Sequence, residues 1–200
     1  MTMKKPLITL VLAVAAAPLA GCISFGAKPP PSLMTLTATS APAAGSQQNS
    51  ASAKSIVIQV PVTPASIATP NVPVQATPTT IAYVKEAVWA EPPARLFARL
   101  LADTVSARSG MVVLSTVQSI GDPSASLAGE LRTFGLDATS REAVVVYDAA
   151  LTRSGATTVE KHRFEARVPV AAIDAASAGP ALNQAANQVA SEVSDWVAAR

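Results

Sequence analysis

The amino-acid sequence predicts an α+β domain, in which two helices pack on one face of a mostly antiparallel or mixed sheet. A signal peptide and a tether rich in Pro, Ala and Ser precede this domain. Three observations lead to the fold class. Short segments with the two-residue hydrophobic period of strands occupy the middle of the chain. One segment with the period of a helix lies among them, and a second closes the chain. The two longest strand patterns flank Ser154-Gly155, which is typical of a hairpin.

The strands are expected in a definite order after residue 54. Ile56, Ile58 and Val60 alternate with other residues in a short strand that Pro61 ends. Five prolines between Pro61 and Pro78 indicate an irregular or edge segment. The remaining strands are expected at 81–84, 111–114, 127–132, 143–151 and 159–168.

Two amphipathic helices complete the domain. The first follows Pro92-Pro93, because proline is tolerated in the first turn of a helix, and Gly110 is a natural end. The last is expected to begin at Gly179-Pro180. Its apolar residues recur at steps of 4, 3, 4 and 3, and so form one stripe that can cover a sheet. They are Leu182, Ala186, Val189, Val193 and Trp196.

Residues 1–21 are predicted to be a cleaved lipoprotein signal peptide. Lys4 and Lys5 form a positive start, and an apolar run from residue 7 to residue 17 follows them. This run is shorter than the roughly 20 residues that a helix needs to span a bilayer. The sequence L-A-G-C at residues 19–22 resembles the bacterial lipobox, in which the peptidase cuts just before the cysteine.

Cys22 is therefore the predicted site of lipid attachment. Its thiol would carry a diacylglycerol, and its new amino terminus an acyl chain such as palmitate; no other cofactor is expected. Several acyl chains anchor a protein far more firmly than one chain does. Ile23 stands where an aspartate often marks retention in the inner membrane, so it favours the outer membrane, with the domain facing the periplasm. The alternative is an ordinary secreted protein with an incidental cysteine.

The mature chain divides into a tether and one domain. Residues 22–54 are expected to be the lipidated N-terminus and a flexible tether. Prolines 29–31 favour extended geometry, and the stretch 38–53 is rich in small and polar residues without periodicity. Residues 33–36 interrupt it and are expected to dock on the domain as a short strand. Residues 55–200 form the predicted α+β domain.

Composition excludes several classes of function. The chain has 200 residues, 15 of them basic and 13 acidic, and its net charge of +2 does not predict nucleic-acid binding. A single cysteine excludes an internal disulfide, and a single histidine excludes a metal site with two histidines. Removal of Lys4 and Lys5 with the signal leaves 15 − 2 = 13 basic residues against 13 acidic ones.

The sequence shows no enzyme active site. It has no Gly-rich phosphate loop and no nucleophile elbow. His162 is the only histidine that could act as a base, and the strand pattern places it beside Phe164 as a packed or edge residue. Glu130, Asp137 and Glu142 show no pairing and are expected on solvated faces. We therefore predict that the protein is not an enzyme and that it has no catalytic, cofactor-binding or metal-binding residues.

The two tryptophans have different expected places. Trp196 is expected to pack in the core at the end of the last helix, whereas Trp89 is either a core residue or an exposed anchor. A contact with a partner protein is the alternative for both, because tryptophan is enriched at interface hot spots. Aromatic residues make up only 4% of the chain, which is too few for a platform that stacks bases.

Several short motifs occur in a fixed order along the chain. They are the lipobox, L-M-T-L at 33–36, I-V-I at 56–58, W-A at 89–90 after Tyr83, L-A-G-E-L-R-T-F at 127–134, F-E-A-R-V-P at 164–169 and the terminal Trp196. In this order they resemble the ABC-type transport auxiliary lipoproteins, the family that includes the PqiC (YmbA) lipoproteins. One departure is that the family often has an aromatic pair before the first tryptophan, where this chain has Tyr83 alone.

The resemblance implies a periplasm-facing lipoprotein of the outer membrane that serves an ABC system with an MCE-type (mammalian cell entry) component. Such systems move lipids or other hydrophobic compounds between the two membranes. The implied partners are an MCE-type periplasmic protein and the ABC permease complex of the inner membrane, and a homo-oligomeric ring is also implied. Two other hypotheses stay open. One is an interaction or activator lipoprotein of another envelope machine, and the other is a secreted hydrolase that uses His162.

Overall fold

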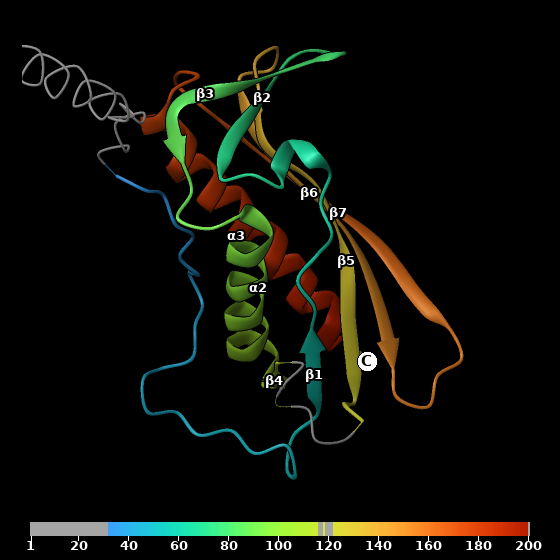
Figure 1. Cartoon of the computed structure of the whole chain (residues 1–200). Helices are drawn as coiled ribbons and strands as arrows, with labels where there is room; N and C mark the ends of the chain where they lie inside the picture. Colours follow the sequence, from blue (N-terminus) through green and yellow to red (C-terminus); the bar gives the residue numbers. More distant parts are fainter. Residues whose placement is uncertain (1–31, 116–117, 119–121, 200) are drawn as a thin grey trace, which may run out of the picture. The chain divides into compact units, whose positions relative to one another are not determined.

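The computed structural model describes residues 32–115, 118 and 122–199, and residues 32–200 form one compact unit. Its described part confirms the predicted α+β fold, with two α-helices and a mixed sheet of seven strands (Figure 1). In chain order the elements are β1 (Ser55–Ile58), the short 3-10 helix η2 (Ala65–Ile67), β2 (Asn71–Thr77), β3 (Thr80–Val88), α2 (Pro93–Ser109), β4 (Val112–Leu114), β5 (Ala125–Asp137), β6 (Glu142–Arg153), β7 (Val159–Pro169) and α3 (Ala175–Ala198).

Strand β5 is the axis of the sheet. Along its whole length it pairs antiparallel with β6, and β6 pairs antiparallel with β7. Its other edge is shared by two strands that both run parallel to it. The first is β1, which pairs with the start of β5 and carries β4 outside it. The second is β2, which pairs with the end of β5 and carries β3 outside it. The sheet therefore has two arms on one side of β5 and a single hairpin on the other.

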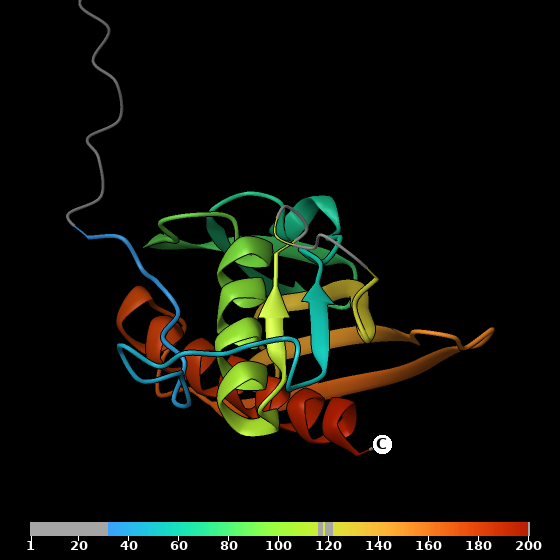
Figure 2. The same cartoon turned by 90° about the horizontal axis from the view of Figure 1, so that it is seen from below.

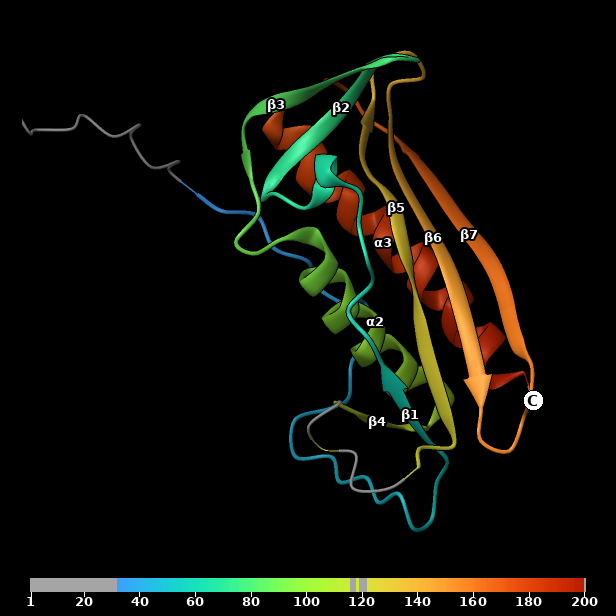
Figure 3. The ribbon, with the colours of Figure 1, turned by 45° about the vertical axis from the view of Figure 1, so that its right-hand side comes forward.

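The helices form a layer on one face of this sheet. Helix α3 runs across β6 and β7, and α2 packs between α3 and the arm made of β1 and β4 (Figures 2 and 3). The ring of Phe97 on α2 meets that of Tyr147 on β6 edge to face, with centroids 5.3 Å apart. Trp89, which follows β3, meets Phe134 on β5 in the same way at 5.5 Å. These aromatic contacts join the two layers into one core.

Two elements differ from the sequence prediction. The proline-rich segment after residue 61 contains a strand, β2, although Pro73 lies within it. Pro73 immediately precedes Val74, where the pairing with β5 begins, so its missing N–H falls outside that ladder. Helix α3 begins at Ala175 rather than at Gly179-Pro180, because the Asp174 carboxylate caps it by accepting the Ser177 N–H at 2.8 Å. Helix α2 spans the predicted residues and ends at Gly110, whose φ of 68° is left-handed.

Residues 34–39, here called the strap, are attached to the domain by hydrogen bonds. Met34 forms a β-bridge with Trp89, as expected for a segment that docks as a short strand, and its N–H donates to the Val88 carbonyl at 2.8 Å. The Asn187 amide on α3 accepts the Thr39 N–H at 2.8 Å and donates to the Thr37 carbonyl at 3.0 Å. In Figure 1 the chain then continues beside the helices to the start of β1.

Substitution of Asn187 by alanine is expected to release the strap. Asn187 is only 6% exposed, and the change removes both of its bonds to the strap backbone. We expect the Thr39 amide to exchange with solvent at least about tenfold faster, with a loss of about 1–2 kcal/mol in stability. Hydrogen exchange by NMR measures this. The control is Asn183→Ala, which removes one exposed bond to Thr37 N–H. An unchanged Thr39 exchange rate in Asn187→Ala would contradict the prediction.

Candidate functional site

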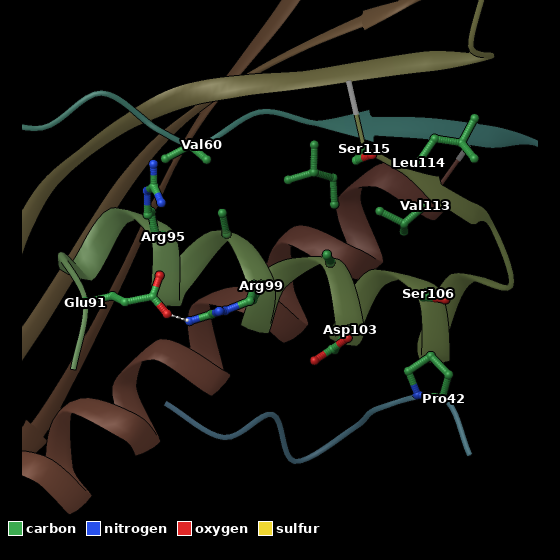
Figure 4. A pocket seen from close by; sticks show the side chains of 13 residues that line it. Pro42, Val60, Glu91, Arg95, Arg99, Asp103, Ser106, Val113, Leu114 and Ser115 are labelled. Atoms are coloured by element: carbon green, nitrogen blue, oxygen red, sulfur yellow. Dashed lines mark hydrogen bonds and ion pairs between the residues drawn. The ribbon is translucent and has the colours of Figure 1, made fainter. Parts of the chain in front are cut away.

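A groove of about 500 Å³ lies along α2 (Figure 4). We call it the α2 groove. Helix α2 forms one wall, and the arm made of β1 and β4 forms the second. Its lining residues are Pro42, Ile58, Val60, Glu91, Arg95, Ala98, Arg99, Ala102, Asp103, Ser106, Val113, Leu114 and Ser115.

The groove is apolar at its floor because of how α2 and β4 are built. The large apolar residues of the helix point towards the core. The apolar residues that the helix contributes to the groove are the small Ala98 and Ala102. Strand β4 pairs only with β1 in the described structure, so the side chains at this edge of the sheet are not covered by a further strand. Ile58, Val113 and Leu114 are consequently half-buried, and they form the floor of the groove.

Charged side chains line the helical wall. Arg99 donates to the Glu91 carboxylate at 2.5 Å, so these two charges largely neutralise each other. Arg95 extends towards Val60, and no side-chain hydrogen bond or ion pair engages it within the described residues. Asp103 lies on the side of the groove that holds Pro42. The groove thus combines an apolar floor with an arginine, Arg95, that has no side-chain partner among the residues the structure describes.

The segment that follows the strap contributes the third wall. Pro42 lines the groove, and Gln48 exchanges hydrogen bonds with Ser106 of α2, with its amide nitrogen 2.9 Å from the hydroxyl. Ser106 is only 8% exposed, and this contact holds the segment after the strap against the C-terminal half of α2, beside the groove. A part of the predicted tether is therefore a structural part of the candidate site.

His162 is an aromatic packing residue at the edge of the domain. Its ring lies 4.4 Å from that of Phe164 and 5.9 Å from that of Trp196, measured between centroids. Trp196 is half-buried here, between β7 and the end of α3. This agrees with the prediction of a packed or edge histidine, since His162 is exposed on the edge strand β7 and still contacts two aromatic rings. Among the residues that the structure describes, no group of three His, Cys, Asp or Glu side chains could hold a metal ion.

The carboxylates predicted on solvated faces lie in ion pairs and turns. Glu142 contacts Arg167 at 3.2 Å, and Glu130 contacts Arg132 at 3.6 Å. Asp137 accepts backbone N–H groups in the turn between β5 and β6. Their partners are arginines or backbone amides, and no pair of them shares a proton. This arrangement stabilises the sheet face rather than supplying acid–base chemistry.

Asp148 lies between two arginines, Arg132 and Arg163, on this charged face of the sheet. Its two carboxylate oxygens accept from Nε and Nη2 of Arg163 at 2.6 and 2.7 Å. This hydrogen bond is the main reason why the pKa of Asp148 lies below its usual value, and the nearby charges of Arg163 and Arg132 add to the effect. Asp148 is therefore ionised at neutral pH. Burial raises the pKa of the hydroxyl of Tyr147, the residue before Asp148 on β6. This hydroxyl stays neutral and donates a hydrogen bond to the Ala128 carbonyl at 3.1 Å.

Trp89 is a core residue and not an exposed anchor, because only 1% of it is accessible to solvent. The predicted lipid attachment site, Cys22, lies outside the described residues together with the predicted signal. Within the described part of the chain, no helix is long and apolar enough to cross a membrane.

Two groups of residues were not predicted from the sequence. Asn183 and Asn187, which bind the strap, stand four residues apart on α3, a spacing that places them on one helix face. The spacing of four residues is the sequence feature that could have indicated these two asparagines. The α2 groove had no comparable signal, since Ile58 and Ala98 are brought together only by the fold.

Comparison with known proteins supplies the family. The model of the ABC-type transport auxiliary lipoprotein component matches residues 35–194. The chain belongs to this family. The match confirms the resemblance drawn from the ordered motifs, and it places the protein among auxiliary components of transport systems rather than in an enzyme family. The lipoprotein family also indicates association with a membrane and with an ABC transport system.

Two solved structures share the fold. A crystal structure of a Xanthomonas campestris protein, assigned to the family DUF330, superposes with a TM-score of 0.70 at 20% identity, covering 84% of this chain and 95% of that one. A crystal structure of an uncharacterized protein gives a TM-score of 0.63 at 14% identity, covering 72% of this chain and 92% of the other. No curated protein matches this chain.

Proposed function

We propose that this lipoprotein is anchored in the outer membrane through Cys22 and faces the periplasm. There it serves an ABC system of the MCE type that moves lipids or other hydrophobic compounds between the two membranes. The observation that carries the proposal is the family match over residues 35–194, which begins 13 residues after the lipobox cysteine. A domain of this family behind a lipobox needs no transmembrane helix to work at a membrane.

The proposed partners are an MCE-type periplasmic protein and the ABC permease complex of the inner membrane. A homo-oligomeric ring is part of the proposal, and β7 offers a means of assembly. In the described structure this strand pairs on one side only, with β6, over 11 regular positions. An unpaired strand edge can add a strand from another chain. The acyl chains on Cys22 are the only groups that the proposal adds to the polypeptide.

The proposal is tested by following the lipid and the location together. The wild-type chain is expected to incorporate radiolabelled palmitate and to fractionate with the outer membrane. Cys22→Ser removes the thiol, so it should lose the label and leave the outer-membrane fraction. Ile23→Asp serves as the matched control, because it keeps the thiol. It should retain the label but move to the inner membrane.

Partner capture separates the proposed system from another envelope machine. The wild-type lipoprotein, crosslinked in cells and purified, is expected to bring down an MCE-type protein. Recovery of a cell-wall enzyme instead, with no MCE-type protein, would favour the activator alternative. Lack of palmitate incorporation would refute the anchor, whatever the partner is.

A further inference from the structure

We propose that the α2 groove binds a single-chain amphiphile with an anionic head, its chain on the apolar floor and its head at Arg95. This deepens the proposed function, on which it rests, by assigning a ligand class and a place on the domain. Four features of the groove support it, namely its volume, its floor, its charge and the chain segment that lies at one end.

The volume and floor suit one apolar chain. About 500 Å³ lies within the usual range of small-molecule sites, roughly 300–1,000 Å³, and such sites are mostly apolar with few polar groups. The floor is formed by Ile58, Val113 and Leu114 from the sheet and by Ala98 and Ala102 from the helix. A chain laid between them would remove from water the aliphatic surface that the edge of β4 leaves uncovered.

The charges select an anionic head and its position. Arg99 is already paired with Glu91, whereas Arg95 has no ion-pair partner in the described structure and extends beside Val60. A guanidinium offers a planar set of donors that suits a carboxylate or phosphate. Asp103, further along the helix, repels an anion from the opposite end. Arg95 also stands in the first turn of α2, where the helix dipole favours negative charge.

The chain segment at one end of the groove favours a small ligand over a peptide. The segment that bonds to Ser106 through Gln48 lies against the C-terminal half of α2, where Pro42 and Ser106 line the groove. An extended peptide that added a strand to β4 would need free backbone along this edge, but β4 has only three residues. The geometry therefore favours a short chain that enters beside Arg95 over a polypeptide that runs through the groove.

Binding can be measured with the mature chain, residues 22–200, made water-soluble by Cys22→Ser. The probes are dodecanoate and dodecyltrimethylammonium, which have chains of equal length and opposite head charges, each below its micellar concentration. Calorimetry gives the affinity, and backbone NMR maps the site. Dodecanoate is expected to bind at least about fivefold more tightly than the cation, with shifts at groove residues such as Ala98 and Val113.

Three variants complete the test. Arg95→Gln should weaken dodecanoate binding by about fivefold, and Ala102→Phe, which fills the floor, should abolish it. Arg108→Gln is the matched control. It removes an arginine of the same helix that is paired with Asp195 outside the groove, and it should leave the affinity unchanged. Circular dichroism checks that each variant folds.

Some outcomes would overturn the inference. These are equal binding of both probes, shifts that map away from the groove, and an affinity that does not respond to Arg95→Gln or to Ala102→Phe. If the probes fail to bind while Cys22 is acylated and an MCE-type partner is captured, the proposed ligand of the α2 groove is refuted and the proposed function stands. Binding with no acylation would leave the groove assignment in place and refute the anchor.

Discussion

Replacement of Trp89 by alanine is expected to lower the free energy of unfolding by about 4 kcal/mol. Trp89 is 1% exposed and is the largest fully buried side chain in the described part of the chain. Its ring packs edge to face against that of Phe134 on β5. It also forms the β-bridge to Met34, so a cavity here would loosen both the core and the point where the strap attaches. Chemical denaturation of the soluble mature chain measures the loss.

Trp89→Phe is the informative control. The indole Nε1 of Trp89 is buried without a hydrogen-bond partner in the described structure, so its removal takes no hydrogen bond away. We expect this variant to lose about 1–2 kcal/mol, which reflects the smaller volume alone. A loss in Trp89→Phe as large as that in Trp89→Ala would mean that the N–H group, and not the packing, carries the stability.

Gly129→Ala is expected to cost about 3 kcal/mol, although it adds a single methyl group. A Cβ at position 129 would lie 2.3 Å from the Asp148 carbonyl oxygen and 2.6 Å from Cε2 of Tyr147. Neither atom can retreat easily. The carbonyl belongs to the backbone of β6, and the Tyr147 ring is fully buried against Phe97. The variant should therefore force β5 and β6 apart, which thermal unfolding would show as a lower midpoint.

Gly179→Ala provides the comparison, because it adds the same methyl group in α3. There the nearest atom is the flexible Met34 sulfur at 3.3 Å. We expect a change of less than about 1 kcal/mol, since the helix propensity of alanine and the following Pro180 act in opposite directions. Similar losses in both variants would show that contact with β6 is not what excludes a side chain at position 129.

The sequence was sufficient for elements that local pattern controls. Helix α2 was predicted with its correct ends, because Pro92-Pro93 and Gly110 act through backbone conformation alone. Strands β6 and β7 were predicted because the alternation of β7 is regular and because Ser154-Gly155 between them indicates a hairpin. Strand β2 was missed because its proline, Pro73, is tolerated only where the ladder with β5 does not need an N–H, and that depends on the partner strand.

The candidate site was less predictable than the fold. His162 was correctly expected to be a packed or edge residue beside Phe164, because a strand's alternation fixes which face a side chain occupies. The α2 groove depends on contacts between segments far apart in the chain. Gln48 and Ser106 are 58 residues apart, and Asn187 binds residues nearly 150 positions away. Periodicity carries no information on such contacts. The role of Cys22 remains a prediction, because it lies outside the described residues.

The strap also limits how far the domain can stand from a bilayer. If Cys22 carries the lipid, only 34 − 22 = 12 residues separate the anchor from Met34, where the strap is bonded to the domain. An extended chain of that length reaches at most about 40 Å, against about 110 Å for a tether that stayed loose to residue 54. The Trp89 end of the domain is then the end held near the membrane surface, and any partner that bridges the periplasm must cover the remaining distance.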